Sequence, residues 1–300
     1  MKLLNYKKGF QAYLKLEKSL SSNSIDAYLR DLSKFFQYLE FKSLNLAPRE
    51  VEIAHVQDFM AWLYDVDIGP RSQARILSGI KAFFNYLLME DIVVSNPTSL
   101  VEGPKLGVKL PEVLSIIEID SIIKAIDLTS KEGERNRAIL ETLYGCGLRV
   151  SELINLKVSN LLFEEGFIRV TGKGNKERIV PIGSTAIKFI QYYFEHRRNH
   201  QTVKKGAEDI VFLNNRGVGL TRVMIFTIVK KLCEKANITK VVSPHTFRHS
   251  FATHLIDGGA DLRAIQEMLG HKSITTTEIY THLDRQYLRE AIAQFHPRVK

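Results

Sequence analysis

Apolar residues in the first hundred positions recur at intervals of three and four, which is the period of an amphipathic helix. One long set is preceded by serine and asparagine at 21–23, residue types that cap helix N-termini. A second follows Gly69 and Pro70, and proline suits the first helical turn. With two shorter patterns, these sets predict an all-α unit over residues 1–95. The sets are Ile25, Leu29, Leu32, Phe36 and Leu39; Ile76, Ile80, Phe83 and Leu87; and the stretches 3–16 and 55–64.

The pattern changes twice further along the chain. Residues 96–111 hold three of the eight prolines and show no helical period, which indicates a linker between domains. Helical spacing then resumes, and three short β-rich runs separated by glycine-containing turns predict a small antiparallel meander. We therefore predict a mainly α, multi-domain protein with a mixed α/β C-terminal domain over 112–300. The runs are 161–163, 167–171 and 178–181, after helices at 119–126 and 135–144 and before a mostly helical remainder from 185.

Charge divides the chain at the same place. The 12 basic residues before Lys105 are matched by 12 acidic ones, so the remaining 30 basic and 21 acidic residues carry the whole net charge of +9. A basic excess confined to one domain favours a polyanionic partner, although a solvated basic face explains it equally well. Two isolated cysteines, the lack of a long apolar run and an N-terminus unlike a signal peptide predict a cytoplasmic protein without a membrane span.

Two glycine-containing segments carry candidate anion-binding residues. In GCGLRVSE, Arg149 follows a Gly-x-Gly break at a predicted helix start, and Glu152 lies three residues on. An arginine oriented there by a carboxylate is suited to hold a phosphate, but it is also typical of a local ion pair. In TGKGNK, Lys173 stands between two glycines at a predicted hairpin tip, where the backbone can approach a ligand. A lysine at a turn tip is otherwise simply solvated.

The stretch PHTFRHSFATH raises the question of a metal site. His245 and His249 are four residues apart, as in the zinc motif HExxH, but Thr246 stands where that motif has its glutamate. Arg248 lies three residues after His245, so a permanent cation would share the pocket with the metal. An anion site formed by His245 and Arg248 is the better hypothesis.

A last segment, LGHKSITTTEIYTH, contains His271 in a Gly-His turn and Tyr280 nine residues later. A single tyrosine is normally part of a core. Close to several cationic side chains, however, Tyr280 becomes a candidate nucleophile, because the phenolate form is stabilised there.

The motifs RVSE, TGKG, HTFRHSFATH and LGHKS, followed by that tyrosine, resemble in this order the tyrosine recombinase (integrase) family, and within it the Xer subfamily. The similarity also covers SSNSIDAYLRDLSKFFQYL and the C-terminal HPR. It implies an N-terminal SAM-like core-binding domain and a C-terminal catalytic domain of tyrosine recombinase type.

The resemblance assigns roles to the motif residues. Arg149 and Arg248 would hold a scissile DNA phosphate and His271 would donate a further hydrogen bond to it, while His245 would accept the tyrosine's proton or orient the phosphate. Tyr280 would attack to give a 3′-phosphotyrosyl link. The remaining catalytic and supporting residues are Lys173, which would protonate the leaving 5′ oxygen, and Glu152, which would order the pocket.

The same resemblance implies a wider reaction scheme. The partners would be double-stranded DNA with a short specific site, a homo- or hetero-tetramer with a related recombinase, and an FtsK-type translocase. No metal, ATP or other cofactor would be needed, and a Holliday junction would resolve chromosome dimers at cell division. The tail 284–300 would dock onto a neighbouring subunit or pack on its own domain. Arg71, Arg75 and Ser78 share a face that would contact DNA or simply be solvated.

Four other functions are compatible with parts of the pattern. An integrase of a mobile element would use the same chemistry, and a type IB topoisomerase-like enzyme would relax DNA without pairing sites. A catalytically inactive DNA-binding regulator conflicts with the full set of catalytic residue types. A metal hydrolase conflicts with Thr246 and Arg248.

Overall fold

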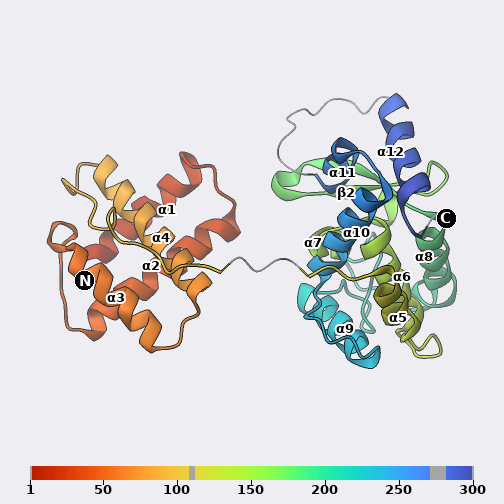
Figure 1. Ribbon diagram of the computed structural model, residues 1–300, viewed down its shortest axis with the longest axis horizontal. Coiled ribbons are helices and arrows are strands. Elements are labelled where there is room, and N and C mark those ends of the chain that lie inside the picture. Colours follow the sequence, from red (N-terminus) through yellow and green to blue (C-terminus); the bar gives the residue numbers. More distant parts are fainter. Residues whose placement is uncertain (1, 108–111, 271–281, 299–300) are drawn as a thin grey trace. The chain divides into compact units, whose positions relative to one another are not determined.

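The chain folds around two separate hydrophobic cores. The computed structural model describes residues 2–107, 112–270 and 282–298. The two units run over 1–109 and 110–300, so their boundary falls inside the proline-containing stretch 96–111 (Figure 1). The mainly helical fold class with a small antiparallel sheet is confirmed. None of the helices in the described ranges has the length and hydropathy of a bilayer-spanning segment.

The described part of the N-terminal unit has four α-helices, each formed where the apolar spacing predicts one. The Ser21 hydroxyl caps α2 by accepting from the Ser24 N–H, and Pro70 occupies the first turn of α4. Helices α2 and α4 pack against each other through the two long apolar sets. The helices are α1 (Lys7–Leu16), α2 (Ser22–Phe41), α3 (Ile53–Asp65) and α4 (Pro70–Met89), with short 3-10 turns η1 (Lys2–Tyr6) and η2 (Pro48–Glu50).

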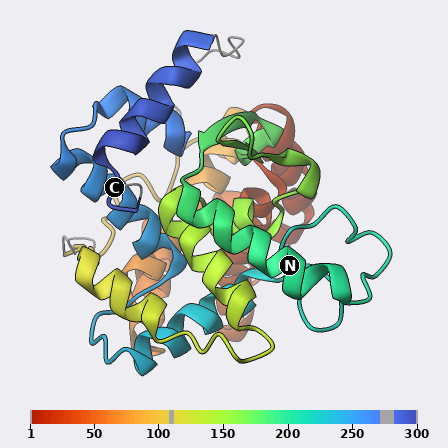
Figure 2. The same cartoon turned by 90° about the vertical axis from the view of Figure 1, so that its right-hand side faces the viewer.

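The C-terminal unit combines eight α-helices in its described part with one small sheet. Helices α6 and α8 lie side by side, and α10 packs on α6 (Figure 2). The helices are α5 (Ile116–Lys124), α6 (Gly133–Gly145), α7 (Val150–Ile154), α8 (Ser184–His196), α9 (Arg222–Lys235), α10 (Pro244–Gly258), α11 (Leu262–Leu269) and α12 (His282–Phe295), with 3-10 turns η3 (Val158–Asn160) and η5 (Arg198–His200).

The sheet is a three-stranded antiparallel meander in the order β1 (Leu161–Leu162), β2 (Phe167–Thr171) and β3 (Glu177–Pro181). Strand β3 begins one residue earlier than predicted and pairs Glu177 with Thr171. The tip of the β2–β3 hairpin is a 3-10 turn, η4 (Lys173–Asn175), in which Gly174 has φ of +75°. A glycine takes this left-handed conformation without strain. The hairpin therefore carries Lys173 at its tip.

The C-terminal segment packs on its own domain. Helix α12 contacts α10, α11 and β3 and buries Leu288 and Ile292 completely or nearly so. His296 is fully buried, with its ring against those of Tyr144 and Phe251. The following Arg298, in turn, pairs with two carboxylates, Asp120 at 2.9 Å and Glu141 at 3.2 Å. Docking of 284–300 onto a neighbouring subunit stays a prediction, whereas the packing within the chain is what this structure contains.

Leu288→Ala should lower the free energy of unfolding by about 2–5 kcal/mol, because it leaves a cavity at a fully buried position. Urea unfolding at two protein concentrations that differ twenty-fold measures this loss in free energy. Packing within one chain predicts the same loss at both concentrations, and Gln294→Ala, at an exposed position of α12, should change little. A loss that shrinks on dilution would show that the helix docks on a second subunit instead, because dilution removes the association that the substitution weakens.

Candidate active site

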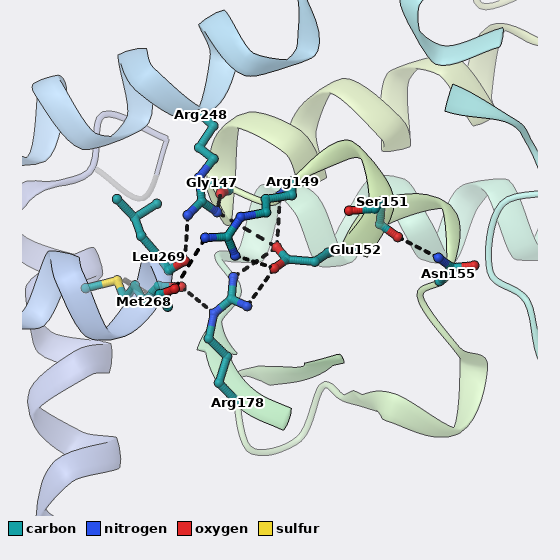
Figure 3. Close-up of polar contacts among 10 residues, drawn as sticks. Gly147, Arg149, Ser151, Glu152, Asn155, Arg178, Arg248, Met268 and Leu269 are labelled. Atoms are coloured by element: carbon teal, nitrogen blue, oxygen red, sulfur yellow. Dashed lines mark hydrogen bonds and ion pairs between the residues drawn. The ribbon is translucent and has the colours of Figure 1, made fainter. Parts of the chain in front are cut away.

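In the C-terminal unit, three arginines converge on one buried carboxylate. Glu152 is in the short helix α7, and its side chain is 1% exposed. The guanidinium groups come from the residue before α7, from strand β3 and from helix α10 (Figure 3). Segments that are distant in the sequence therefore meet at this one acidic group. The three arginines are Arg149, Arg178 and Arg248.

Arg149 holds the carboxylate from the N-terminus of α7. Its backbone N–H donates to Glu152 Oε2 at 2.9 Å, and its Nη1 donates to Oε1 at 2.8 Å. The guanidinium also reaches the Gly270 carbonyl at 3.3 Å, a long hydrogen bond. With 32% of its side chain exposed, Arg149 is the most accessible of the three.

Arg178 binds the same carboxylate as a two-pronged fork. Its Nη1 donates to Glu152 Oε1 at 2.8 Å and its Nη2 to Oε2 at 3.0 Å. Its Nε donates to the Met268 carbonyl near the end of α11, at 2.8 Å. Only 7% of the side chain is exposed, so this arginine is a buried part of the site.

Arg248 is held mainly by backbone carbonyls. Its Nη1 donates to Gly147 at 2.7 Å and its Nη2 to Leu269 at 2.5 Å, while Nη1 lies 3.8 Å from Glu152 Oε2. Its side chain is 7% exposed. Each Nη carries two hydrogens, so the guanidinium retains donors beyond these two contacts.

Two glycines let the backbone present these carbonyls. Gly147 has φ of +57°, and a Cβ there would lie 2.4 Å from the Phe251 ring. Gly270 has φ of +63°, and a Cβ there would come 3.1 Å from Arg178 Cδ. The left-handed conformation and the close approach both require glycine. The glycines of GCGLR and LGH therefore serve the geometry of the arginine cluster.

The charges of the cluster are strongly coupled. Burial by itself raises the pKa of Glu152, but hydrogen bonds and charge from Arg178, and then hydrogen bonds from Arg149, lower it to about 2. Burial and repulsion from Arg149 lower the pKa of Arg248 to about 9, against the opposing effect of Glu152. At neutral pH one carboxylate therefore lies among three guanidinium groups, and the net positive charge of the cluster favours the binding of a further anion.

The structure brings together three of the predicted site residues, Arg149, Glu152 and Arg248. His245 lies in the first turn of α10 and is exposed. His271 and Tyr280 lie outside the described residues. His249 is half-buried, and within the described ranges no group of three potential His, Cys, Asp or Glu metal ligands occurs.

The three residues of the predicted DNA-contact face in the N-terminal unit differ in the contacts that they make. Arg71, Arg75 and Ser78 are all exposed on α4. Arg75, however, forms an ion pair with Asp31, a buried residue of α2, and the Ser78 hydroxyl donates to the Ala74 carbonyl at 2.9 Å. Arg71 lies in the first turn of α4.

Arg178 is the site residue that sequence reasoning missed. In the motif KERIVP it reads as a polar position at the start of a strand. A signal was present, because the neighbouring Ile179, Val180 and Pro181 predict a buried strand, and a basic residue at its start needs a buried partner. Nothing in the sequence pattern, however, identifies Glu152 as that partner.

Comparison with known proteins identifies the class. Residues 112–287 match the model of the phage integrase family, and residues 8–91 match that of the phage integrase N-terminal SAM-like domain. The chain therefore belongs to the phage integrase family, the tyrosine recombinases, and is a site-specific recombinase enzyme.

Its relatives include proteins of the Xer group. The chain is 44% identical over 289 residues to tyrosine recombinase XerD of Staphylococcus epidermidis, covering 95% of this chain and 96% of that protein. The post-cleavage complex of XerH with palindromic difH substrate matches with a TM-score of 0.70 and 25% identity, over 96% of this chain and 84% of the other. The Tn1549 transposon integrase solved with circular intermediate DNA shares the fold, with a TM-score of 0.72 at 20% identity over 96% and 95% of the chains. The resemblance read from the motifs is confirmed.

Glu152→Gln should destabilise the protein at neutral pH, because a pKa lowered from 4.5 to about 2 corresponds to about 3 kcal/mol of stabilisation. This contribution is fully present above pH 4.5 and is lost as the pH falls towards 2, since the unfolded chain takes up the proton first. Urea unfolding of both proteins between pH 7 and pH 3 measures the difference, which should shrink on acidification.

Glu164→Gln, in the turn between β1 and β2, is the matched control because this carboxylate is exposed. It should leave both the stability and its pH dependence close to those of the wild type. A difference between wild type and Glu152→Gln that stayed constant down to pH 3 would contradict the assigned pKa of Glu152.

Proposed function

We propose that the chain cuts and rejoins DNA through a 3′-phosphotyrosyl intermediate on Tyr280. The observation that supports this is the cluster of three arginines around one buried carboxylate, which leaves an excess of positive charge. A phosphodiester under attack acquires negative charge on its non-bridging oxygens. Donors that are already oriented towards that charge lower the barrier without having to reorganise.

The two proposed phosphate ligands differ in how they are held. Arg149 is the more exposed, and its long hydrogen bond to the Gly270 carbonyl at 3.3 Å costs little to exchange for a phosphate oxygen. Arg248 is held more tightly by the Gly147 and Leu269 carbonyls and offers its remaining N–H groups from a fixed position. His271 supplies a further hydrogen bond, and His245, at the exposed start of α10, accepts the tyrosine's proton or orients the phosphate.

The proposed chemistry conserves the phosphodiester. The Tyr280 oxygen forms a bond to phosphorus, the bond from phosphorus to the 5′ oxygen breaks, and Lys173 gives a proton to the leaving oxygen. Reversal with the 5′-hydroxyl of a second duplex exchanges strands. This scheme uses no metal, ATP or other cofactor, since the arginines supply the positive charge.

The wider role that we propose is recombination of paired short DNA sites by a homo- or hetero-tetramer through a Holliday junction. Similarity to XerD supports chromosome-dimer resolution at cell division, with an FtsK-type translocase as a further partner. Integration of a mobile element is the second candidate, because a transposon integrase shares the fold. The same site could also serve a type IB topoisomerase-like relaxer, which would act on supercoiled DNA without pairing two sites.

A DNA substrate nicked close to the cleavage position should trap a covalent protein–DNA adduct in the presence of EDTA. Tyr280→Phe should give none, because it lacks the attacking oxygen. Arg149→Ala should slow adduct formation by about 10²–10³-fold, as expected for loss of one transition-state donor, while most DNA affinity remains. Denaturing gels and a binding assay on the same DNA measure the two quantities.

Tyr287→Phe is the control for the tyrosine, since Tyr287 lies in α12 and is 42% exposed. It should form the adduct at the wild-type rate. Adduct formation by Tyr280→Phe, or a requirement for a divalent metal, would refute the proposed chemistry. Relaxation of supercoils without exchange between two sites would favour the topoisomerase-like alternative.

We also propose that the exposed face of α4 contacts the DNA backbone. Arg71→Ala should weaken DNA binding and lower the slope of log affinity against log salt by about 1, because one phosphate contact is lost. Arg75→Ala should in addition lower the stability of the N-terminal unit, since it leaves the buried Asp31 without its ion pair. Salt titrations and thermal unfolding of the two variants separate the effects, and an unchanged salt slope for Arg71→Ala would exclude this contact.

A further inference from the structure

Arg178 occupies an unusual position for a charged residue. It is the second residue of β3, and the residues that follow it, Ile179 and Val180, belong to the hydrophobic interior. Burying a guanidinium in such a strand is costly, and an apolar residue of similar size often stabilises a fold equally well or better. The position therefore points to a role other than stability alone.

The contacts of Arg178 are made mainly with other groups of the protein. Its Nη1 and Nη2 both bind Glu152, its Nε binds the Met268 carbonyl, and its side chain is 7% exposed. Arg149, which binds the same carboxylate, is 32% exposed, and the equally buried Arg248 approaches Glu152 only to 3.8 Å, whereas both Nη atoms of Arg178 bind the carboxylate. Arg178 thus acts on other protein groups, and the question is which of them it positions.

The first group is the lysine hairpin. Arg178 pairs with Val170 across the two strands that carry this hairpin. A Cβ built on Gly172 would lie 3.6 Å from both Arg178 Nη1 and Glu152 Oε1, so the backbone directly before Lys173 rests against the ion pair. The Gly172 N–H also donates to the Lys176 carbonyl at 2.7 Å, which closes the base of the turn. The base of the turn that carries Lys173 is therefore tied to the Arg178–Glu152 pair.

The second group is the end of α11. The bond from Arg178 Nε to the Met268 carbonyl ties this end to β3, and the adjacent Leu269 carbonyl holds Arg248. A single guanidinium thereby links the hairpin, the carboxylate and the segment that holds a proposed phosphate ligand. Lysine could not replace it, because an ammonium group lacks the planar fork that binds both carboxylate oxygens while donating from Nε.

We propose that Arg178 is a positioning residue that holds the Lys173 hairpin against the Arg149–Arg248 phosphate site, so that its loss impairs chiefly the protonation of the leaving 5′ oxygen. This inference rests on the proposed function, in which Lys173 is the acid. In that step the phenolate oxygen of Tyr280 forms a bond to phosphorus, the bond from phosphorus to the 5′ oxygen breaks, and the Lys173 ammonium gives its proton to the departing oxygen, leaving a neutral amine and a 5′-hydroxyl.

A substrate with sulfur at the bridging 5′ position tests this role directly. A thiol has a pKa of about 8.5, far below that of an alcohol, so a thiolate leaves without a proton. Loss of the acid, or of its position, should therefore slow cleavage of the oxygen substrate and have little effect on the sulfur substrate. Loss of a phosphate ligand or of the fold should slow both equally.

The experiment measures single-turnover adduct formation by the full-length protein on both nicked substrates. Arg178→Met should slow the oxygen substrate by about 10²-fold or more, as expected for impaired general acid catalysis, and the sulfur substrate by less than about 5-fold. Arg178→Lys, which keeps the charge but loses the fork, should show the same selective loss to a smaller degree. Arg169→Met, at an exposed position of β2 in the same hairpin, should leave the ratio of the two rates unchanged.

Lys173→Ala separates the inference from the function on which it rests. If the sulfur substrate rescues Lys173→Ala but neither Arg178 variant, Lys173 is the acid and the inference about Arg178 is wrong. If it does not rescue Lys173→Ala, the proposed role of Lys173 fails and the inference fails with it. Thermal unfolding accompanies each rate, and loss of folding in both Arg178 variants would assign this residue to stability and overturn the proposal.

Discussion

The arginine cluster of the C-terminal unit depends on one interaction, the pairing of three guanidinium groups with the Glu152 carboxylate. Three guanidinium groups could not share one buried region without an anion, because their mutual repulsion would add to the cost of removing them from water. Glu152 offsets part of that repulsion through direct hydrogen bonds to Arg149 and Arg178 and a longer approach to Arg248. It does so with one negative charge against three positive ones. The remaining positive charge is what a phosphodiester in the same place would compensate.

Backbone carbonyls complete the arrangement. Gly147 and Leu269 accept from Arg248, and Met268 accepts from Arg178. These acceptors satisfy buried N–H donors without adding a second full negative charge, which would cancel the field at the site. The accepting carbonyls of Gly147 and Leu269 lie in the turns formed at Gly147 and Gly270. Because these turns fix the acceptors, the guanidinium groups are oriented before any ligand binds. The glycines, the carboxylate and the arginines therefore act as one unit.

Much of this protein is readable from its sequence because the relevant signals are local. The apolar spacing around Ile25 and Ile76 predicts helices that the structure contains, and the β-rich runs near Phe167 predict the meander. Arg149 and Glu152 lie three residues apart, so their pairing follows from helical geometry. Arg178 could not be found in this way, because it lies 26 positions after Glu152 in the chain. Its other contact is with the backbone carbonyl of Met268, which no residue type in the sequence indicates. The Arg75–Asp31 pair, across two helices, was hidden for the same reason.

The sequence by itself determined the two domains' helical periodicity, the basic excess after the linker and the order of motifs that indicates a tyrosine recombinase. These features depend on residues close together in the chain or on the order of residue types, both of which are visible without coordinates. Only the tertiary structure decided that Glu152 is shared by three arginines, that two of them are buried, and that His296 and Arg298 pack against their own domain. Such features depend on which distant segments meet. That is set by the packing of the whole core, and no local pattern encodes it.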